Sequence, residues 1–307
     1  MAAATATVTD LMDEAWKLRD PRTKDWFMLS SPWPNVYLTV LYFLLVWLGP
    51  KVMRNRQAFS LREVMILYNI IITALSCWMF KEILLSALNV GYDWTCALMK
   101  PEDPQDIRMA NVLWWYYFSK AFEFLDTLFF ILRKNNHQIT FLHVYHHASM
   151  FNIWWVVLNW GPTGQAFFGP LANSFVHIIM YTYYCLSAVP SLRPYLWWKK
   201  YITKLQLLQF FIVIFHTYRG IYKSCGYILW LQYFLGVYMF SLVALFTNFY
   251  MQSYIKKRPS SKDQKDVDKN KNVYQNGASA AHGKGVSENN GVREGNGITR
   301  RRAKKAE

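Results

Sequence analysis

Three histidines that lie close together in the sequence, His143, His146 and His147, could do chemistry. On a helix, offsets of three and four residues place all three imidazoles within about a 100° sector, facing the same space. An unperturbed imidazole has a pKa of about 6.5, so a neutral histidine can act as a nucleophile or base and a protonated one as an acid. A single buried histidine is usually a satisfied polar group, whereas three on one helical face indicate a reactive site or a metal site.

Charged residues interrupt the apolar stretch before this cluster, where Lys120, Glu123 and Asp126 recur at intervals of three. Neighbours at this spacing share one face of a helix and can pair their charges. A charge at the centre of a membrane helix costs about 2.5 to 3.5 kcal/mol on insertion scales, which favours a functional site. The two carboxylates are expected to orient histidines on a neighbouring helix. The alternative is that Lys120 and Glu123 only connect helices.

Two later apolar stretches add further polar side chains. His177 has Asn173 one helical turn before it and Tyr181 one turn after it, so the three share a face. The next stretch contributes Gln206, Gln209 and His216. For the last of these we expect a structural role.

A metal centre is the main alternative use of the histidines, because HxxHH clusters also occur in membrane di-iron desaturases and hydroxylases. Those enzymes have several histidine boxes, whereas this chain has seven histidines, of which His282 lies in a polar tail. Glu123 and Asp126 could serve as carboxylate ligands in such a centre. The HExxH motif of zinc proteases is absent. A di-iron centre is therefore the less favoured use of these histidines, and we expect no bound metal or other cofactor.

The elements that must position these residues are membrane helices. The chain is 53% hydrophobic but has a mean hydropathy of only +0.03, so apolar residues are segregated into blocks. About 20 apolar residues span a bilayer core, and seven stretches qualify: 34–53, 61–85, 112–132, 141–160, 166–189, 201–222 and 226–255. We predict an all-α multi-pass membrane protein with seven transmembrane helices. A seven-span receptor or transporter is the alternative class, although passive recognition does not need clustered histidines and acids.

The basic residues set the predicted orientation. The net charge is +15, but much of the excess lies in the low-complexity tail, so no nucleic-acid partner is expected. The two sets of loops carry similar numbers of basic residues, and Lys256, Lys257 and Arg258 directly after the last span place the C-terminus in the cytosol. We therefore predict a lumenal segment 1–33, a membrane domain 34–255 and a disordered cytosolic tail 256–307. Cys96 and Cys225 then share the lumenal side, where a disulfide is our hypothesis and two free thiols the alternative.

Four motifs occur in order on successive predicted spans. They are Lys120-x-x-Glu123-x-x-Asp126-Thr127, His143-x-x-His146-His147, His177-x-x-Met180-Tyr181-x-Tyr183-Tyr184 and Thr203-x-x-Gln206-x-x-Gln209-Phe210. Together they resemble the very-long-chain fatty acid elongases, the ELO family, over about residues 33–254. The segment 191–200 is most like the animal members that act on polyunsaturated chains.

The resemblance implies a 3-oxoacyl-CoA synthase of the endoplasmic reticulum that joins a long acyl-CoA to malonyl-CoA with loss of carbon dioxide. It also implies six helices in a barrel around an acyl tunnel, with one further helix outside. The implied partners are the two CoA thioesters, membrane lipid, the other enzymes of the elongation cycle, and a homo- or hetero-oligomer with other elongases. Near the C-terminus, Lys304 and Lys305 resemble a dilysine retrieval signal of that membrane.

Our hypothesis for the chemistry is that His146 carries the acyl group, assisted by His177 across the tunnel, while tyrosines line the tunnel. The proposed supporting residues are His143, His147 and Asn173 for the thioester or enolate oxygen, and Glu123 and Asp126 for the histidine tautomers. Cys185 is the rival acyl carrier.

Basic residues near the expected cytosolic mouth are candidates for binding the CoA phosphates. They are Arg133, Lys134, Lys199, Lys200 and Lys204. The alternative is that they only follow the positive-inside rule.

Overall fold

A computed structural model describes residues 7–255 of the chain, and this part consists of helices and the loops that connect them. The long helices are α2 (Trp33–Val52), α3 (Arg62–Val90), α4 (Pro104–Leu132), α5 (Phe141–Trp160), α6 (Phe168–Ala188), α7 (Lys199–Tyr222) and α8 (Leu229–Tyr250). The shorter elements are α1 (Val8–Lys17), the 3₁₀ helices η1 (Asn136–Gln138), η2 (Gly164–Phe167) and η3 (Pro190–Tyr195), and a π-helical turn, Met251–Ile255. The predicted retrieval signal at Lys304 and Lys305 lies outside the described residues.

The seven long helices coincide with the seven predicted stretches, with two notable differences at their ends. Helix α3 continues to Val90, where Gly91 stops it with a φ of 69°, a left-handed conformation that glycine adopts without steric cost. Helix α4 begins at Pro104, eight residues before the predicted start. Its first turn is capped by Asp103, whose side chain accepts from the backbone of Gln105 at 2.8 Å.

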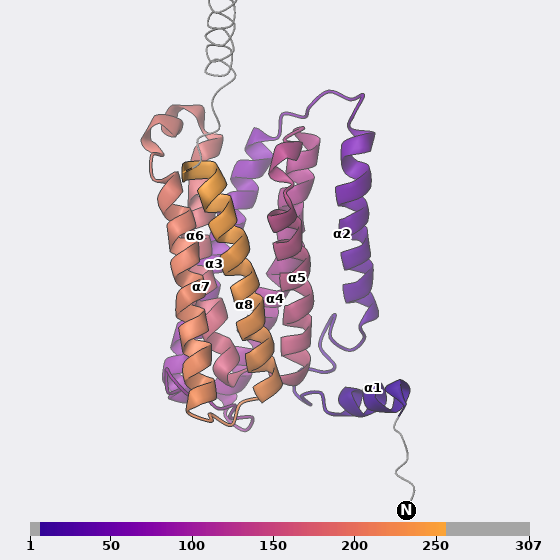
Figure 1. Ribbon diagram of the computed structural model, residues 1–307, viewed down its shortest axis with the longest axis vertical. Coiled ribbons are helices and arrows are strands. Elements are labelled where there is room, and N and C mark those ends of the chain that lie inside the picture. The colour runs from indigo at the N-terminus through magenta and orange to yellow at the C-terminus, as the bar shows by residue number, and fades with distance from the viewer. Residues whose placement is uncertain (1–6, 256–307) are drawn as a thin grey trace, which may run out of the picture. The chain divides into compact units, whose positions relative to one another are not determined.

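Helix α1 was not predicted, because it is too short and too polar to register as a membrane span. It begins with a capping box, in which Thr7 accepts from the backbone of Asp10 and Asp10 accepts from that of Thr7. The helix lies across the end of the helix bundle rather than along it (Figure 1). Trp16 stacks on Trp155 of α5, with ring centroids 6.1 Å apart.

Three of the long helices, α2, α3 and α8 with its π-helical turn, are apolar and long enough to cross a membrane on hydropathy alone. Helices α4 to α7 are of similar length but carry buried polar side chains, among them Lys120, Glu123 and His177, which lower their average hydropathy. The chain is therefore an all-α multi-pass membrane protein. That all seven helices cross the membrane remains our prediction.

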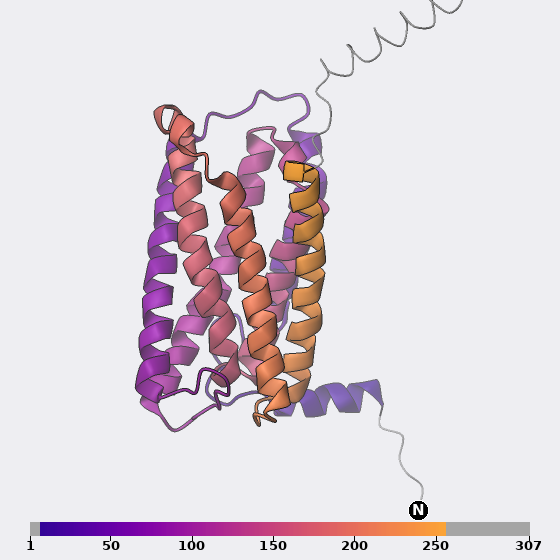
Figure 2. The same ribbon diagram turned by 60° about the vertical axis from the view of Figure 1, so that its left-hand side comes forward.

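Six helices form a ring. Around it α4 packs on α5, α5 on α8, α8 on α7, α7 on α6, α6 on α3, and α3 on α4 again. Helix α2 packs only on the outside, against α4 and α5, as Figure 1 shows. Figure 2 shows α3, α6, α7 and α8 side by side along another face of the ring. This arrangement agrees with the six-helix barrel and single outer helix that the resemblance implies.

Polar contacts and one close approach hold α2 against the ring. The amide of Asn35 donates to Asn152 of α5 at 2.7 Å and accepts from the hydroxyl of Tyr117 of α4 at 3.1 Å. Near the other end of α2, Gly49 lies so close to Ile131 that a Cβ on the glycine would come within 2.8 Å of the Ile131 Cδ1 atom. Small residues at such positions let membrane helices pack closely.

A buried ionic cluster closes the end of the ring that carries the α3–α4 loop. The guanidinium of Arg22 contacts Asp20 at 2.7 Å and Asp106 at 2.6 Å, and Thr163 donates to Asp106 at 2.7 Å. The hydroxyl of Tyr92 also donates to Asp106. Burial alone would lower the pKa of Arg22, but the two carboxylates raise it above its usual value, so the guanidinium stays charged. The cluster joins the N-terminal segment to the loops under the ring.

Candidate active site

A cavity lies inside the ring. Its lining comes from α4 to α8 and the loops below them, and most of it is apolar. Along α5 the lining runs from His146 to Val157, eleven steps along the helix with a rise of about 17 Å. A long apolar cavity with a few polar groups suits a hydrocarbon chain that has a reactive head.

The histidine cluster lies near the start of α5, at one end of this cavity. The rings of His143 and His147 are 4.3 Å apart between centroids, and those of His146 and His147 are 5.3 Å apart. The three imidazoles therefore gather as the spacing predicted. Within the described part of the chain, His146 is the member of the cluster that lines the cavity. That position suits a residue that reacts with a substrate.

Hydrogen bonds at the start of α5 hold the cluster in place. Thr140 caps the helix by accepting from the backbone N–H of His143 at 3.3 Å. The Nε2 atom of His143 lies 2.7 Å from the hydroxyl of Thr127 on α4, and Tyr42 of α2 lies 3.2 Å from the same hydroxyl. His143 is thus linked through Thr127 to the outer helix.

The charged residues of α4 pair as the spacing predicted. The ammonium of Lys120 lies 2.6 Å from Oε1 of Glu123, with both residues at most 2% exposed. Nδ1 of His177 on α6 lies 3.5 Å from the same carboxylate oxygen. A carboxylate in this place can orient the imidazole, as we expected of Glu123. Burying two charges is costly unless they pair. The contact between Lys120 and Glu123 therefore offsets part of the cost of burying both side chains on α4.

Asp126 has a different partner from the one expected. Its carboxylate accepts a hydrogen bond from the hydroxyl of Tyr181 at 2.8 Å. The expectation that Asp126 fixes a histidine tautomer is therefore wrong for this structure. The reason is the relative register of α4 and α6: a step of three residues along α4, from Glu123 to Asp126, is matched by a step of four along α6, from His177 to Tyr181.

Sequence reasoning missed Tyr116, which completes the contacts between α4 and α6. Its hydroxyl donates to Oδ1 of Asn173 at 2.7 Å, and both residues line the cavity. The ammonium of Lys120 lies 4.3 Å from the centre of the Tyr116 ring. The available signal was position, because Tyr116 lies one turn before Lys120 on the same face of α4.

The two glutamines of α7 differ in position. Gln209 is buried and lines the cavity. Gln206 instead directs its amide at Sδ of Met180 on α6, at 3.5 Å. His216 lines the cavity too and stacks on Phe168, with ring centroids 4.0 Å apart.

The basic residues named as candidates for binding CoA form two groups at the end of the ring where α5 begins. Arg133 and Lys134 follow α4, and Lys134 donates to the backbone of Arg54 at 3.1 Å. At the start of α7, the ammonium groups of Lys200 and Lys204 lie 5.1 and 5.4 Å from the ring centre of Tyr201. Lys199 is exposed beside them.

The side chains around the histidine cluster include groups that could bind a metal ion. Within residues 7–255, no group of three or more histidine, cysteine, aspartate or glutamate side chains has an arrangement that could hold one. The carboxylates of Glu123 and Asp126 are occupied by Lys120 and Tyr181. This donor arrangement does not fit the di-iron alternative.

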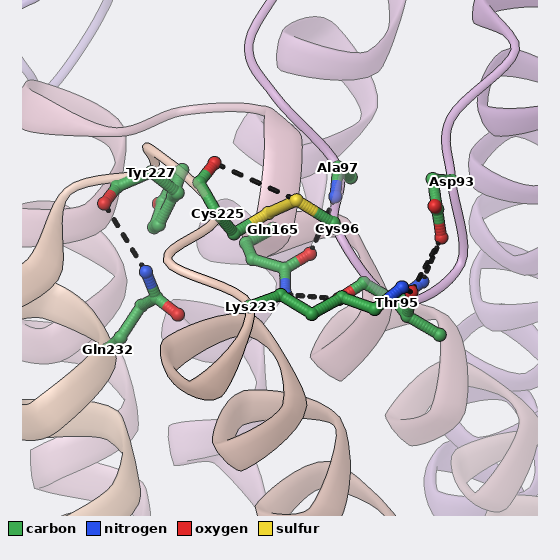
Figure 3. The surroundings of a disulfide bond; sticks show 9 residues. All are labelled: Asp93, Thr95, Cys96, Ala97, Gln165, Lys223, Cys225, Tyr227 and Gln232. Carbon is green, nitrogen blue, oxygen red and sulfur yellow. Dashed lines mark hydrogen bonds between the residues drawn. A yellow bond between two sulfur atoms is a disulfide. The ribbon is translucent and has the colours of Figure 1, made fainter.

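Cys96 and Cys225 form a disulfide, with Cα atoms 5.3 Å apart (Figure 3). It ties the α3–α4 loop to the loop between α7 and α8, across 129 residues of sequence. Cys77 and Cys185 are free. Cys185, the rival acyl carrier, lies on α6 two turns beyond His177, with its sulfur 4.0 Å from the backbone oxygen of Ile66.

Comparison with known proteins places this chain among relatives. The GNS1/SUR4 family (ELO) matches residues 27–262. Very long chain fatty acid elongase 2 of Mus musculus is 53% identical over 256 residues, which cover 83% of this chain and 87% of that protein. Very long chain fatty acid elongase 5 of Homo sapiens is 53% identical over 264 residues, or 86% of either chain. This chain therefore belongs to the ELO (GNS1/SUR4) family.

Proposed function

We propose that this protein is a very-long-chain 3-oxoacyl-CoA synthase, the condensing enzyme of fatty acid elongation. The observation that carries the proposal is the position of His146, at one end of a long apolar cavity and on the same helix face as two further histidines. The names of the relatives in mouse and human support this activity.

In the first half-reaction, a ring nitrogen of neutral His146 attacks the thioester carbonyl of an acyl-CoA, while the acyl chain occupies the apolar cavity. The bond from carbon to sulfur breaks, and the thiolate of CoA takes the proton that the imidazole loses. The product is an acyl-imidazole and free CoA. His177, oriented by Glu123, is the proposed assisting residue.

In the second half-reaction, malonyl-CoA loses carbon dioxide, and the electron pair left behind forms an enolate. The enolate carbon attacks the acyl carbonyl, the bond from that carbon to the His146 nitrogen breaks, and the departing ring nitrogen takes a proton from water to restore neutral His146. The product is a 3-oxoacyl-CoA two carbons longer than the starting chain. His143, His147 and Asn173 are the proposed hydrogen-bonding groups for the developing oxygen charges. Neither half-reaction requires a metal or another cofactor, so we propose that none takes part.

We further propose that the protein lies in the endoplasmic reticulum membrane, with its N-terminus in the lumen and its C-terminus in the cytosol. The disulfide between Cys96 and Cys225 supports this orientation, because disulfides persist in oxidising compartments such as that lumen. The CoA thioesters then enter from the end that carries Arg133 and Lys200. Polyunsaturated acyl-CoA is the proposed substrate class, and the other elongation enzymes and further elongase subunits are the proposed partners.

The test is elongation by the purified full chain. Long polyunsaturated acyl-CoA and labelled malonyl-CoA should give labelled 3-oxoacyl-CoA in equal yield with and without a chelator. His146→Ala should abolish the product, whereas Cys77→Ala should not, because Cys77 is exposed on α3. Product formation that stops with chelator, or acyl-CoA consumption that requires oxygen, would overturn the proposal.

A further inference from the structure

The end of the cavity away from His146 is polar. Gln165 of η2, His216 and Thr217 of α7, and Gln232 of α8 all line it. Gln232 is 3% exposed and His216 is 7% exposed. We call these four residues the floor of the cavity. A hydrocarbon chain that ends in a methyl group cannot form hydrogen bonds with them, so such a chain does not explain why the floor is polar.

Two atoms of this floor have no hydrogen-bond partner among residues 7–255: Nε2 of His216 and Oε1 of Gln232. The orientation of the Gln232 amide is set by its nitrogen, which donates to the backbone oxygen of Tyr227 at 3.3 Å. The free atom of Gln232 is therefore an acceptor, and a group that satisfies it must donate a hydrogen bond. Leaving such a buried atom unpaired is unfavourable.

The neighbouring amide is already occupied. Oε1 of Gln165 accepts from the backbone of Ala97 at 3.0 Å, and its Nε2 lies 3.4 Å from the backbone oxygen of Thr95. Figure 3 shows Gln165 beside the disulfide of Cys96, so the covalent link between the loops fixes this side of the floor.

Gly220 of α7 lets the side chains of Gln165 and Gln232 come close to the helix backbone. A Cβ on Gly220 would lie 2.8 Å from Oε1 of Gln232 and 2.3 Å from Nε2 of Gln165, so no larger residue fits there without moving them. His216 lies one turn before Gly220 on the same face of α7. The unpartnered atom of Gln232, on α8, therefore lies against α7 one helical turn from His216, which carries the other unpartnered atom.

We propose that this floor is a binding subsite for a hydroxyl group at the far end of the acyl chain. This inference rests on the proposed function and names a substrate class for it. A hydroxyl donates one hydrogen bond, which Oε1 of Gln232 can accept, and its oxygen can accept one from His216 in the tautomer that carries the ring proton on Nε2. A terminal carbonyl has no proton to donate, and a terminal carboxylate would bring a buried negative charge with no cation among the floor residues named here.

The test compares two acyl-CoAs of equal length, one ending in a hydroxyl and one in a methyl, with the purified full chain. For chains long enough to reach the floor, the hydroxyl-ended substrate should have the higher kcat/KM, by roughly tenfold. A pair of chains too short to reach the floor should show no such preference. This comparison uses the unmodified protein, so its result does not depend on whether a substituted protein folds.

Variants assign the preference to the floor. Gln232→Leu and His216→Phe should each remove the hydroxyl preference, while Gln252→Leu, an exposed change after α8, should leave it intact. Elongation of methyl-ended chains without any hydroxyl preference, or a preference that survives Gln232→Leu, would overturn the subsite and indicate that the floor binds an ordered water only. Failure to elongate either chain would instead overturn the proposed function, and this inference with it.

Discussion

The hydroxyl of Tyr116 on α4 donates a 2.7 Å hydrogen bond to the amide oxygen of Asn173 on α6. With its oxygen occupied, the Asn173 amide is left with its NH₂ group as a donor. In the proposed mechanism such a donor stabilises negative charge on a substrate oxygen. Tyr116 is then a positioning residue, because it acts through Asn173.

Tyr116→Phe should therefore lower kcat for elongation by roughly tenfold, with little change in KM, because the amide loses its fixed orientation. Tyr117→Phe is a matched control. Its hydroxyl donates to Asn35 on the outer helix and not to the cavity, so it should retain kcat. Equal losses in both variants, or a loss confined to KM, would contradict the positioning role.

The buried pair of Lys120 and Glu123 should show strong coupling in stability. Lys120→Met alone leaves a carboxylate without its ammonium and should lower the free energy of unfolding by roughly 3 to 5 kcal/mol. Lys120→Met combined with Glu123→Gln should be less destabilised than Lys120→Met alone. Thermal unfolding of the detergent-purified variants gives the comparison. A double variant less stable than the single one would show that the charge pairing is not what stabilises this region.

The disulfide should affect both the gel mobility of the protein and its free energy of unfolding. Wild-type protein should change mobility on reduction, and Cys96→Ser and Cys225→Ser should each remove that change, whereas Cys77→Ser should not. Loss of the link should lower unfolding stability by roughly 2 to 5 kcal/mol, because it closes a long loop of chain. A mobility change that persists in Cys96→Ser would show that the bond does not form between these residues.

Charge reversal at the start of α7 tests the entry site for CoA. Lys200→Glu combined with Lys204→Glu should raise KM for acyl-CoA several-fold, with an effect that weakens as salt is added, because screening reduces attraction to phosphates. Lys51→Glu is the control, since Lys51 is a basic residue of the outer helix, near Trp47. An unchanged KM would mean that the lysines serve orientation in the membrane alone.

Much of the fold could be predicted because a bilayer leaves few choices. Every backbone polar group must be satisfied within lipid, so an apolar stretch of sufficient length becomes a helix. The prediction missed structure where polarity masks the helix: α1, which carries Asp10 and Lys17, and the first turns of α4, which contain Asp106 and Arg108. In those places local capping and tertiary ion pairs determine the structure.

The candidate site was predictable in its members and less so in its contacts. Spacing along one helix gathers the histidines and pairs Lys120 with Glu123, because both are local effects. The partner of Asp126 depends on how α4 is rotated against α6, which spacing within either helix does not encode. The same holds for Tyr116 and for the exposure of His146, rather than His147, to the cavity.

The most direct measurement is the mass of the protein after it reacts with acyl-CoA alone, without malonyl-CoA. We expect release of CoA and one acyl group on the peptide that contains His146, both lost in His146→Ala and both retained in Cys185→Ala. Adding malonyl-CoA should remove the label and yield 3-oxoacyl-CoA. An acyl group found on Cys185, or CoA release that persists in His146→Ala, would contradict acyl transfer through His146.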